Sequence, residues 1–289
     1  FIMPIFIKEG ENIKKEISTM PGIYQLSPEN AVKYVEELNK KGVNKFIYFG
    51  VINHEHKDPE GTIAYQDHNP VNIVMREVKN KGLNLINIAD VCYCEYTDHG
   101  HCGLLSKDEG ETIDNDSSLE GLAKQAVSFV NNGADIVAPS CMIDGMIGAI
   151  REGLDYEGFG STPIMSYSSK YSSSLYGPFR EAAEGAPKFG DRKAYQMDFR
   201  RSNECLTEAE LDIMEGADML MIKPATFYLD IIHKISAVSN IPVGAYHISG
   251  EYSMIHFSAQ KGFLDLRLTA LENLYAIKRA GADFIISYF

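Results

Sequence analysis

The chain has 289 residues, of which 45% are hydrophobic and 23% are charged, so it can bury a large core and is not disordered as a whole. Its net charge of −13 disfavours nucleic acid or an anionic membrane as the main partner, although local arginines could still bind a small anionic substrate. No apolar run reaches the roughly 18 residues that a membrane-spanning helix needs.

The start of the chain and its cysteines bear on where the protein works. Phe1 follows no methionine, and the apolar character of residues 2–7 is already that of a buried strand, so the start looks trimmed. No signal-peptide pattern opens the chain. Five cysteines, three of them crowded, suit metal binding in a reducing cytoplasm better than a disulfide framework. We therefore expect a cytoplasmic protein.

One sequence pattern recurs five times along the chain: a helical stretch ends in glycine, one or two residues follow, and an apolar run begins. Glycine suits the left-handed residue that closes a helix. Short apolar runs without alternation are typical of strands buried on both faces. With three further apolar runs, the expected strands are residues 2–7, 45–51, 85–91, 136–140, 163–168, 219–224, 242–246 and 284–289.

Amphipathic stretches separate most of these strands, for example residues 28–40, 117–131 and 264–279. Eight alternating strand and helix units predict a (β/α)8 TIM barrel formed by a single domain, residues 1–289. The rival is a doubly wound open sheet, which usually has fewer strands, and no Gly-x-Gly-x-x-Gly turn follows any predicted strand. The polar segment 106–118 is predicted to be a loop or small hairpin.

Chemically unusual residues follow the predicted strands. In barrels of this kind the chemistry lies at the C-terminal ends of the strands. We therefore expect one site to gather the residues at these ends: Asp90, Cys92, Cys94, Ser140, Asp144, Lys170, Lys223, His247, Ser249, Ser287 and Tyr288.

The three crowded cysteines are Cys92, Cys94 and Cys102, in the motif DVCYCEYTDHGHCG. Three thiolates on a short loop suit Zn²⁺ and leave its fourth position open, as in catalytic sites. His99 or His101 could instead supply the fourth ligand and close the site. A structural knuckle or three unrelated thiols are the alternatives.

Two lysines end neighbouring predicted strands. Lys223 closes the apolar run MLMIK, where burial would lower its pKa and free its amine to attack a ketone. Lys170 lies just past the preceding strand, and two ammonium groups in one pocket would depress each other further. Taken singly, either lysine could simply reach out to solvent; the pair favours Schiff-base chemistry.

Arg180 and Arg192 flank a loop that contains glycine and proline. Arginine offers a planar fork for carboxylates, so a basic loop over a barrel mouth would make a lid. By composition alone, a solvated surface loop is the alternative.

Together these pieces resemble the 5-aminolevulinate dehydratase (porphobilinogen synthase) family from end to end. The densest motifs are DVCYCEYTDHGHCG, VAPSCMIDGMIGAIRE, PIMSYSSKYSSSLYGPFREAA, FGDRKAYQMD, EGADMLMIKPATFYLD and AYHISGEYSMI. The resemblance implies a TIM barrel that condenses two molecules of 5-aminolevulinate into porphobilinogen, with loss of two waters, early in tetrapyrrole (heme) biosynthesis.

The resemblance also implies roles for individual residues. Lys223 resembles the lysine that forms a Schiff base with the first substrate, and Lys170 the lysine that engages the second. The other implied residues are Ser249 and Tyr288 for the first carboxylate, Arg180 and Arg192 with Gln196 and Tyr176 nearby for the second, and the acids Asp90 and Asp144 near the metal and the lysines.

The same resemblance implies the metals. Cys92, Cys94 and Cys102 resemble the catalytic zinc ligands beside the second-substrate site. Glu208 matches a carboxylate that binds an activating magnesium in many bacterial members, with an ordinary helix-surface acid as the alternative. Three positions depart from the usual pattern: Met146 replaces Arg, Cys141 replaces Asp, and Thr207 replaces Arg.

Assembly is the last implied property. Family members form homo-oligomers, octamers in particular, through an N-terminal arm that wraps around a neighbour, and we expect that arm to be missing here. Two other functions stay open: a class I aldolase-like Schiff-base enzyme, which would have no use for two arginines and a second lysine, and a non-catalytic zinc-binding scaffold on a barrel.

Overall fold

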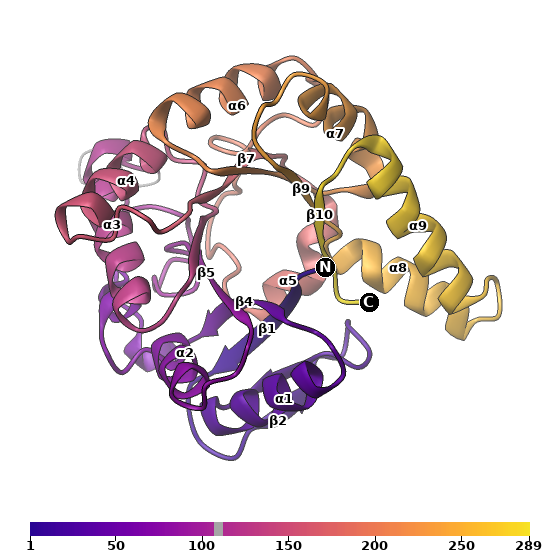
Figure 1. Ribbon diagram of the computed structural model, residues 1–289, viewed down its shortest axis with the longest axis horizontal. Coiled ribbons are helices and arrows are strands. Elements are labelled where there is room, and N and C mark those ends of the chain that lie inside the picture. The colour runs from indigo at the N-terminus through magenta and orange to yellow at the C-terminus, as the bar shows by residue number, and fades with distance from the viewer. Residues whose placement is uncertain (107–111) are drawn as a thin grey trace.

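The computed structural model describes residues 1–106 and 112–289, and Figure 1 looks down the axis of a ring of strands surrounded by helices. Within the described residues, eight parallel strands form this ring in chain order. They are β1 (Met3–Lys8), β4 (Lys45–Val51), β5 (Ile86–Val91), β6 (Ile136–Pro139), β7 (Met165–Lys170), β8 (Met219–Lys223), β9 (Val243–Tyr246) and β10 (Phe284–Ile286).

Two seams close the ring. At one seam Ile2 pairs in parallel with Ile286, and the Ile2 amide donates to the Ile285 carbonyl at 2.9 Å. At the other, Val137 pairs with Ile164, next to β7. The predicted TIM barrel is therefore confirmed, and the open sheet is excluded.

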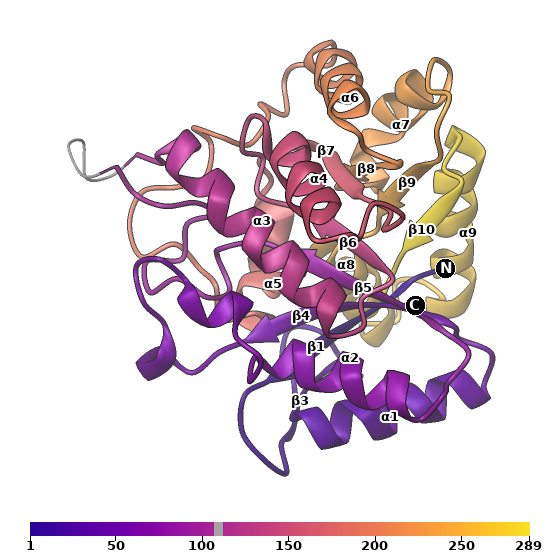
Figure 2. The same cartoon turned by 60° about the vertical axis from the view of Figure 1, so that its left-hand side comes forward.

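Helices cover the outside of the ring (Figures 1 and 2). They are α1 (Pro28–Lys40), α2 (Pro70–Asn80), α3 (Asn115–Asn131), α4 (Met146–Tyr156), α6 (Glu204–Glu215), α7 (Leu229–Ser236), α8 (Ser249–Gln260) and α9 (Leu266–Ala280). The short helix α5 (Gly177–Ala182) lies instead across one end of the ring, where Phe179 packs on Phe6 of β1 and Phe49 of β4. The three helices expected from the sequence are present within two residues of their predicted ends. No helix in the described part of the chain is long and apolar enough to cross a membrane.

A small flanking hairpin was not expected. β2 (Lys14–Glu16) pairs antiparallel with β3 (Tyr24–Leu26), and β3 pairs in parallel with the end of β1. Each strand has only three residues and β2 is wholly exposed, so no apolar pattern in the sequence predicts this hairpin. Between β5 and α3, Leu105 and Ile113 form an antiparallel bridge at the base of the predicted loop or hairpin. The rest of that prediction partly lies outside the described residues (107–111), and its last four residues are the start of α3.

Three of the five copies of the recurring pattern read Gly-Ala-Asp, and the structure shows why aspartate stands there. In each of these three copies the aspartate backbone N–H donates to a carbonyl of the preceding barrel strand or its start, and the carboxylate accepts the N–H of that same residue. The pairs are Asp135 with Asn87, Asp218 with Ile164, and Asp283 with Val243. Each aspartate therefore fixes the register between the strand that follows it and the preceding strand of the barrel.

Replacing Asp218 tests this clamp. Asp218→Ala removes the acceptor of the Ile164 N–H, at 2.8 Å, and should lower the free energy of unfolding by about 1–2 kcal/mol. Urea denaturation measures the change. The control is Asp155→Ala, which removes only a surface ion pair to Arg151 and should cost roughly 0–1 kcal/mol. Equal effects of the two substitutions would contradict the clamp.

Candidate active site

A buried pocket lies at the C-terminal ends of the barrel strands, as the sequence predicted. Nine residues that the sequence singled out line it together: Asp90, Cys94, Ser140, Lys170, Tyr176, Arg180, Arg192, Gln196 and Lys223. Phe49, Glu95 and Phe179 complete the lining. The structure therefore brings both lysines, both arginines and part of the cysteine cluster into one site.

The two lysines are side by side because β7 contains a bulge. Ser166 pairs with Leu220, but Ser169 pairs with Ile222, so β7 accommodates one extra residue. The bulge reverses the alternation of side chains along the strand and re-aims the residues after it. As a result Lys170 pairs directly with Lys223. The sequence placed strand 163–168 too early and Lys170 beyond it, whereas Lys170 is the last residue of β7.

Lys223 is enclosed by aromatic rings. Its Nζ lies 4.4 Å from the centroid of the Tyr246 ring, 4.8 Å from Phe179 and 5.1 Å from Tyr167. Only 4% of the residue is exposed. Burial, followed by the charge of Lys170, lowers the pKa of Lys223 to about 7. Its amine is therefore available in the neutral, nucleophilic form near neutral pH.

Lys170 has a more polar environment. Its Nζ donates to the Ser140 carbonyl at 2.5 Å. Burial favours its neutral form, but the negative charges of Cys102, Cys92 and Cys94 outweigh burial and raise the pKa of Lys170. The two lysines are neighbours in space, yet their pKa values shift in opposite directions.

Asp90 lines the same pocket as the two lysines and interacts electrostatically with both. It is almost fully buried in β5, and its Oδ2 accepts from the Ser140 hydroxyl at 3.0 Å. Burial raises the pKa of Asp90 to about 6, and the charges of Lys223 and Lys170 oppose that rise. Its Oδ1 has no hydrogen bond of normal length among the described residues, and the Tyr167 hydroxyl, which is also buried and unpaired, lies close enough to lower the pKa of Asp90.

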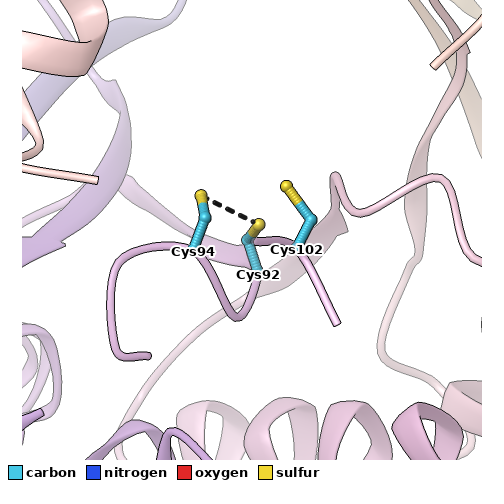
Figure 3. A group of neighbouring side chains, drawn as sticks. All are labelled: Cys92, Cys94 and Cys102. Carbon is cyan, nitrogen blue, oxygen red and sulfur yellow. Dashed lines mark hydrogen bonds between the residues drawn. The ribbon is translucent and has the colours of Figure 1, made fainter. Parts of the chain in front are cut away.

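The three cysteines cluster as predicted (Figure 3). The sulfur atoms of Cys92, Cys94 and Cys102 all lie within 4.8 Å of one another, and all three residues are buried and free of disulfides. Thiolates this close and this well shielded fit the soft, compact ligand set that zinc prefers. Cys141, the fourth cysteine nearby, donates from Sγ to the Val91 carbonyl at 3.8 Å and is not part of this group.

Neither histidine of the motif closes the cysteine site. His99 contacts the Pro59 carbonyl through Nε2 and accepts the His101 N–H at Nδ1. His101 contacts the Phe189 carbonyl through Nε2 and the Tyr195 hydroxyl through Nδ1. Because all four ring nitrogens already have partners elsewhere, the geometry favours three sulfur ligands and an open fourth position over a closed site.

The predicted lid segment folds over the pocket. Arg192 is 7% exposed, and its Nη2 donates to the Gly100 carbonyl at 2.9 Å and to the Gly185 carbonyl at 2.6 Å. Its Nε, the Nε of Arg180 and the Nε2 of Gln196 are buried donors without partners among the described residues. Unsatisfied buried donors are costly, so this trio is well suited to an anionic ligand such as a carboxylate. The solvated-loop alternative does not hold for Arg192.

Ser249, Tyr288 and Tyr176 lie around Lys223. The Ser249 hydroxyl accepts the Phe179 N–H at 3.0 Å, and the Tyr288 hydroxyl contacts the Tyr246 hydroxyl at 2.9 Å. The Tyr176 hydroxyl donates to the Tyr171 carbonyl at 2.7 Å and reaches the Lys223 carbonyl at 3.3 Å. Ser249 and Tyr288 thus each bond a residue, Phe179 or Tyr246, whose ring lies beside the Lys223 amine.

Asp144 and Glu208 lie elsewhere. Asp144 is exposed, and its backbone N–H and carbonyl bond the Asn115 side chain at the start of α3, because positive-φ residues Met142 and Gly145 turn the chain outward. It lines a larger neighbouring cavity of about 930 Å³ together with Glu208, and this cavity shares Gln196 with the lysine pocket. Burial and then the charge of Asp144 raise the pKa of Glu208. Asp144 does not line the lysine pocket itself, and its role as an acid near the metal and the lysines stays a prediction.

Several pocket residues escaped the sequence analysis. Glu95 is 1% exposed, and its Oε2 accepts the Gly50 N–H at 3.0 Å. Tyr167 and Tyr246 surround Lys223 from inside the barrel. Their only signal in the sequence is an aromatic residue within an apolar strand, which is typical of ordinary core packing. Glu95 follows Cys94 directly, and only that position could have drawn attention to it.

The fold and site define the class of protein: a TIM-barrel enzyme with a paired-lysine pocket. The sequence matches the family described as delta-aminolevulinic acid dehydratase over residues 1–289. A relative of that name from Halalkalibacterium halodurans is 49% identical over 288 residues, which cover 100% of this chain and 86% of the relative. One from Staphylococcus epidermidis is 48% identical, covering 100% of this chain and 88% of the relative.

A solved structure is similar as well. The delta-aminolevulinic acid dehydratase (porphobilinogen synthase) of Toxoplasma gondii ME49, in complex with the reaction product porphobilinogen, superposes with a TM-score of 0.96 at 41% identity. The match covers 99% of this chain and 81% of that one. The chain belongs to the delta-aminolevulinic acid dehydratase family, and it is a hydro-lyase of porphyrin biosynthesis.

The opposite pKa shifts of the two lysines can be tested without substrate. Lys170→Met removes the positive charge that lowers the pKa of Lys223, so that pKa should rise above about 7. Competitive labelling with acetic anhydride across pH, read by peptide mass spectrometry, gives the Lys223 midpoint. Lys124→Met, which removes a surface lysine paired with Glu120, should leave the midpoint unchanged. A midpoint that stays in place or falls in Lys170→Met would contradict the electrostatic coupling.

Proposed function

We propose that this protein joins two molecules of 5-aminolevulinate into porphobilinogen by Schiff-base chemistry on the Lys223 and Lys170 pair, assisted by zinc. The observation that carries the proposal is the direct pairing of Lys170 with Lys223 in a buried pocket that also contains two arginines and a carboxylate. A class I aldolase needs one lysine; a second lysine and a second anion site fit a reaction that joins two copies of one keto acid.

Lys223 is the better nucleophile of the pair. Its lowered pKa leaves the amine neutral, so it can attack the ketone carbon of the first substrate. Loss of water then gives an imine, which makes the neighbouring carbon acidic. The buried setting protects that imine from hydrolysis. Ser249 and Tyr288 would bind the carboxylate of this substrate.

Lys170 would engage the second substrate. Its ammonium lies beside the Ser140 carbonyl and near the cysteine sulfurs, and Arg180, Arg192 and Gln196 present unpaired donors for the second carboxylate. Asp90 is close enough to both lysines to interact with their charges, and its pKa of about 6 lets it accept and return a proton near neutral pH. Forming the pyrrole releases two waters, one for each ketone consumed.

Cys92, Cys94 and Cys102 would hold zinc on the Lys170 side of the pocket, where it would supply Lewis-acid polarisation of a substrate carbonyl. Glu208 would hold an activating magnesium in the neighbouring acidic cavity, which Asp144, Glu204, Asp212 and Glu215 also line. We include homo-oligomeric assembly and a cytoplasmic location in the proposal on the strength of the family resemblance.

Borohydride trapping tests the role of Lys223. Reduction in the presence of 5-aminolevulinate should add one reduced substrate mass to the peptide that contains Lys223. Lys223→Gln should lose that adduct and reduce formation of an Ehrlich-positive pyrrole by roughly a thousandfold or more. Lys124→Gln serves as the surface control. Normal pyrrole formation by Lys223→Gln, or an adduct on another lysine alone, would refute the assignment.

The zinc site is tested by one substitution. Cys102→Ser removes one of three sulfur ligands and should lower zinc binding from about one ion per chain by at least roughly tenfold in affinity. Metal analysis after dialysis against a zinc buffer measures this. Cys205→Ser is the matched control, because Cys205 of α6 is also buried but its Sγ contacts the Ser202 carbonyl just before that helix. Undiminished zinc in Cys102→Ser would show that the cluster is not the zinc site.

A further inference from the structure

Two segments meet above the pocket. We call residues 92–102 the cysteine loop and residues 183–197 the lid segment. The Lys188 N–H donates to the His99 carbonyl at 3.0 Å, and Arg192 donates to the Gly100 carbonyl at 2.9 Å. The lid segment is thus held by backbone acceptors that lie between Cys94 and Cys102.

The two backbones also approach closely. A Cβ on Gly100, which has φ +73°, would lie 2.4 Å from the Ala186 carbonyl oxygen. A Cβ on Gly185 would lie 2.8 Å from the Cys94 carbonyl oxygen. Only glycine permits such contacts, and backbone packed this tightly transmits small displacements. A shift of the cysteine loop therefore has to move the lid segment.

His101 makes the side-chain part of this contact. It precedes Cys102 and is 3% exposed, and its ring nitrogens lie 3.1 Å from the Phe189 carbonyl and 3.1 Å from the Tyr195 hydroxyl. A carbonyl only accepts, so Nε2 carries the proton, and Nδ1 accepts from the Tyr195 hydroxyl. The ring also packs on Phe189, with centroids 4.7 Å apart. Both polar atoms of His101 are therefore committed to the lid segment.

Tyr195 connects this contact to the substrate side. It lies between Arg192 and Gln196 in the chain, and the Gln196 N–H donates to the Arg192 carbonyl at 2.9 Å. The same stretch ends where the Met197 N–H donates to the Lys170 carbonyl at 3.1 Å. The Tyr195 hydroxyl therefore helps to anchor the short stretch that carries the Arg192 and Gln196 donors and ends at Lys170.

We propose that His101 is a positioning residue that couples metal binding at Cys102 to closure of the lid segment over the second-substrate site. The inference rests on the proposed function, which assigns zinc to the cysteines and a substrate carboxylate to Arg192. A metal-held Cys102 fixes His101, and His101 fixes the lid segment through Phe189 and Tyr195. Loss of the metal frees the loop and loosens the arginine site.

Zinc-dependent proteolysis tests the coupling. Lys188 and Lys193 are trypsin sites at the surface of the lid segment. In the unaltered full chain, saturating zinc should slow cleavage at these sites roughly tenfold relative to chelator-treated protein. In His101→Phe, which keeps a ring of similar size, the ratio should fall to roughly twofold or less while zinc content stays near one per chain.

His99→Phe is the matched control. His99 is a buried histidine of the same loop, but its side chain contacts Pro59 and the His101 N–H and makes no hydrogen bond to the described lid segment. Its zinc protection should persist. Tyr195→Phe removes only the hydroxyl on the lid side, so it should show an intermediate ratio and remain informative even if His101→Phe folds poorly.

Kinetics provide a second readout. His101→Phe and Tyr195→Phe should raise KM for 5-aminolevulinate more than they lower kcat, and should leave the borohydride adduct at Lys223 intact. Full zinc protection in both variants, or lid cleavage that ignores bound zinc in the unaltered chain, overturns this inference alone. A chain that binds no zinc or forms no Lys223 adduct overturns the proposed function, and this inference with it.

Discussion

Two ammonium groups on neighbouring strands, shielded from water, are the constraint on which the pocket depends. Lys170 and Lys223 are direct strand partners, so their charges cannot be separated by backbone movement. The surroundings reduce the repulsion between the two charges by treating the two lysines differently. Aromatic rings around Lys223 disfavour its charge, while sulfur atoms and a carbonyl beside Lys170 favour one. Two identical side chains thereby acquire different chemistry, which is the usual way in which a site divides labour between like groups.

The cysteine loop and the lid segment form the second half of the site. Their contact consists mostly of carbonyl acceptors, glycine approaches and one histidine, and not of apolar packing. Such contacts are directional, so they hold the arginine at a set position without a large buried area. The same directionality leaves donors on Arg180, Arg192 and Gln196 without partners among the described residues. The lid segment is thus held by hydrogen bonds where it contacts the cysteine loop, and its unpaired hydrogen-bond donors lie where an anion would bind.

Much of the fold was readable from the sequence, and the reasons are physical. Glycine-terminated helices and unbroken apolar runs follow from local sterics and burial, so the ring of eight strands and the range of α1 were predicted correctly. The adjacency of Lys170 and Lys223 followed from strand order. The bulge in β7 did not, because MSYSSK has no periodicity that marks where a residue is inserted. The exposed position of Asp144 could not be predicted either, because the turn at Met142 and Gly145 sets the direction of the chain there. The bonds of His101 to a distant carbonyl and hydroxyl leave no local pattern at all.

The seam between β1 and β10 has a consequence for how the chain reaches this state. Ile2 pairs with Ile286, so the first strand of the barrel must wait for the last before one of its edges is covered. Until then β1 presents unpaired N–H and C=O groups on that side, which is the kind of edge that invites association with other chains. The β2–β3 hairpin already pairs with the far half of β1, at Phe6 and Ile7. It can cap that half during synthesis, which would leave only a short stretch around Ile2 exposed until the ring closes.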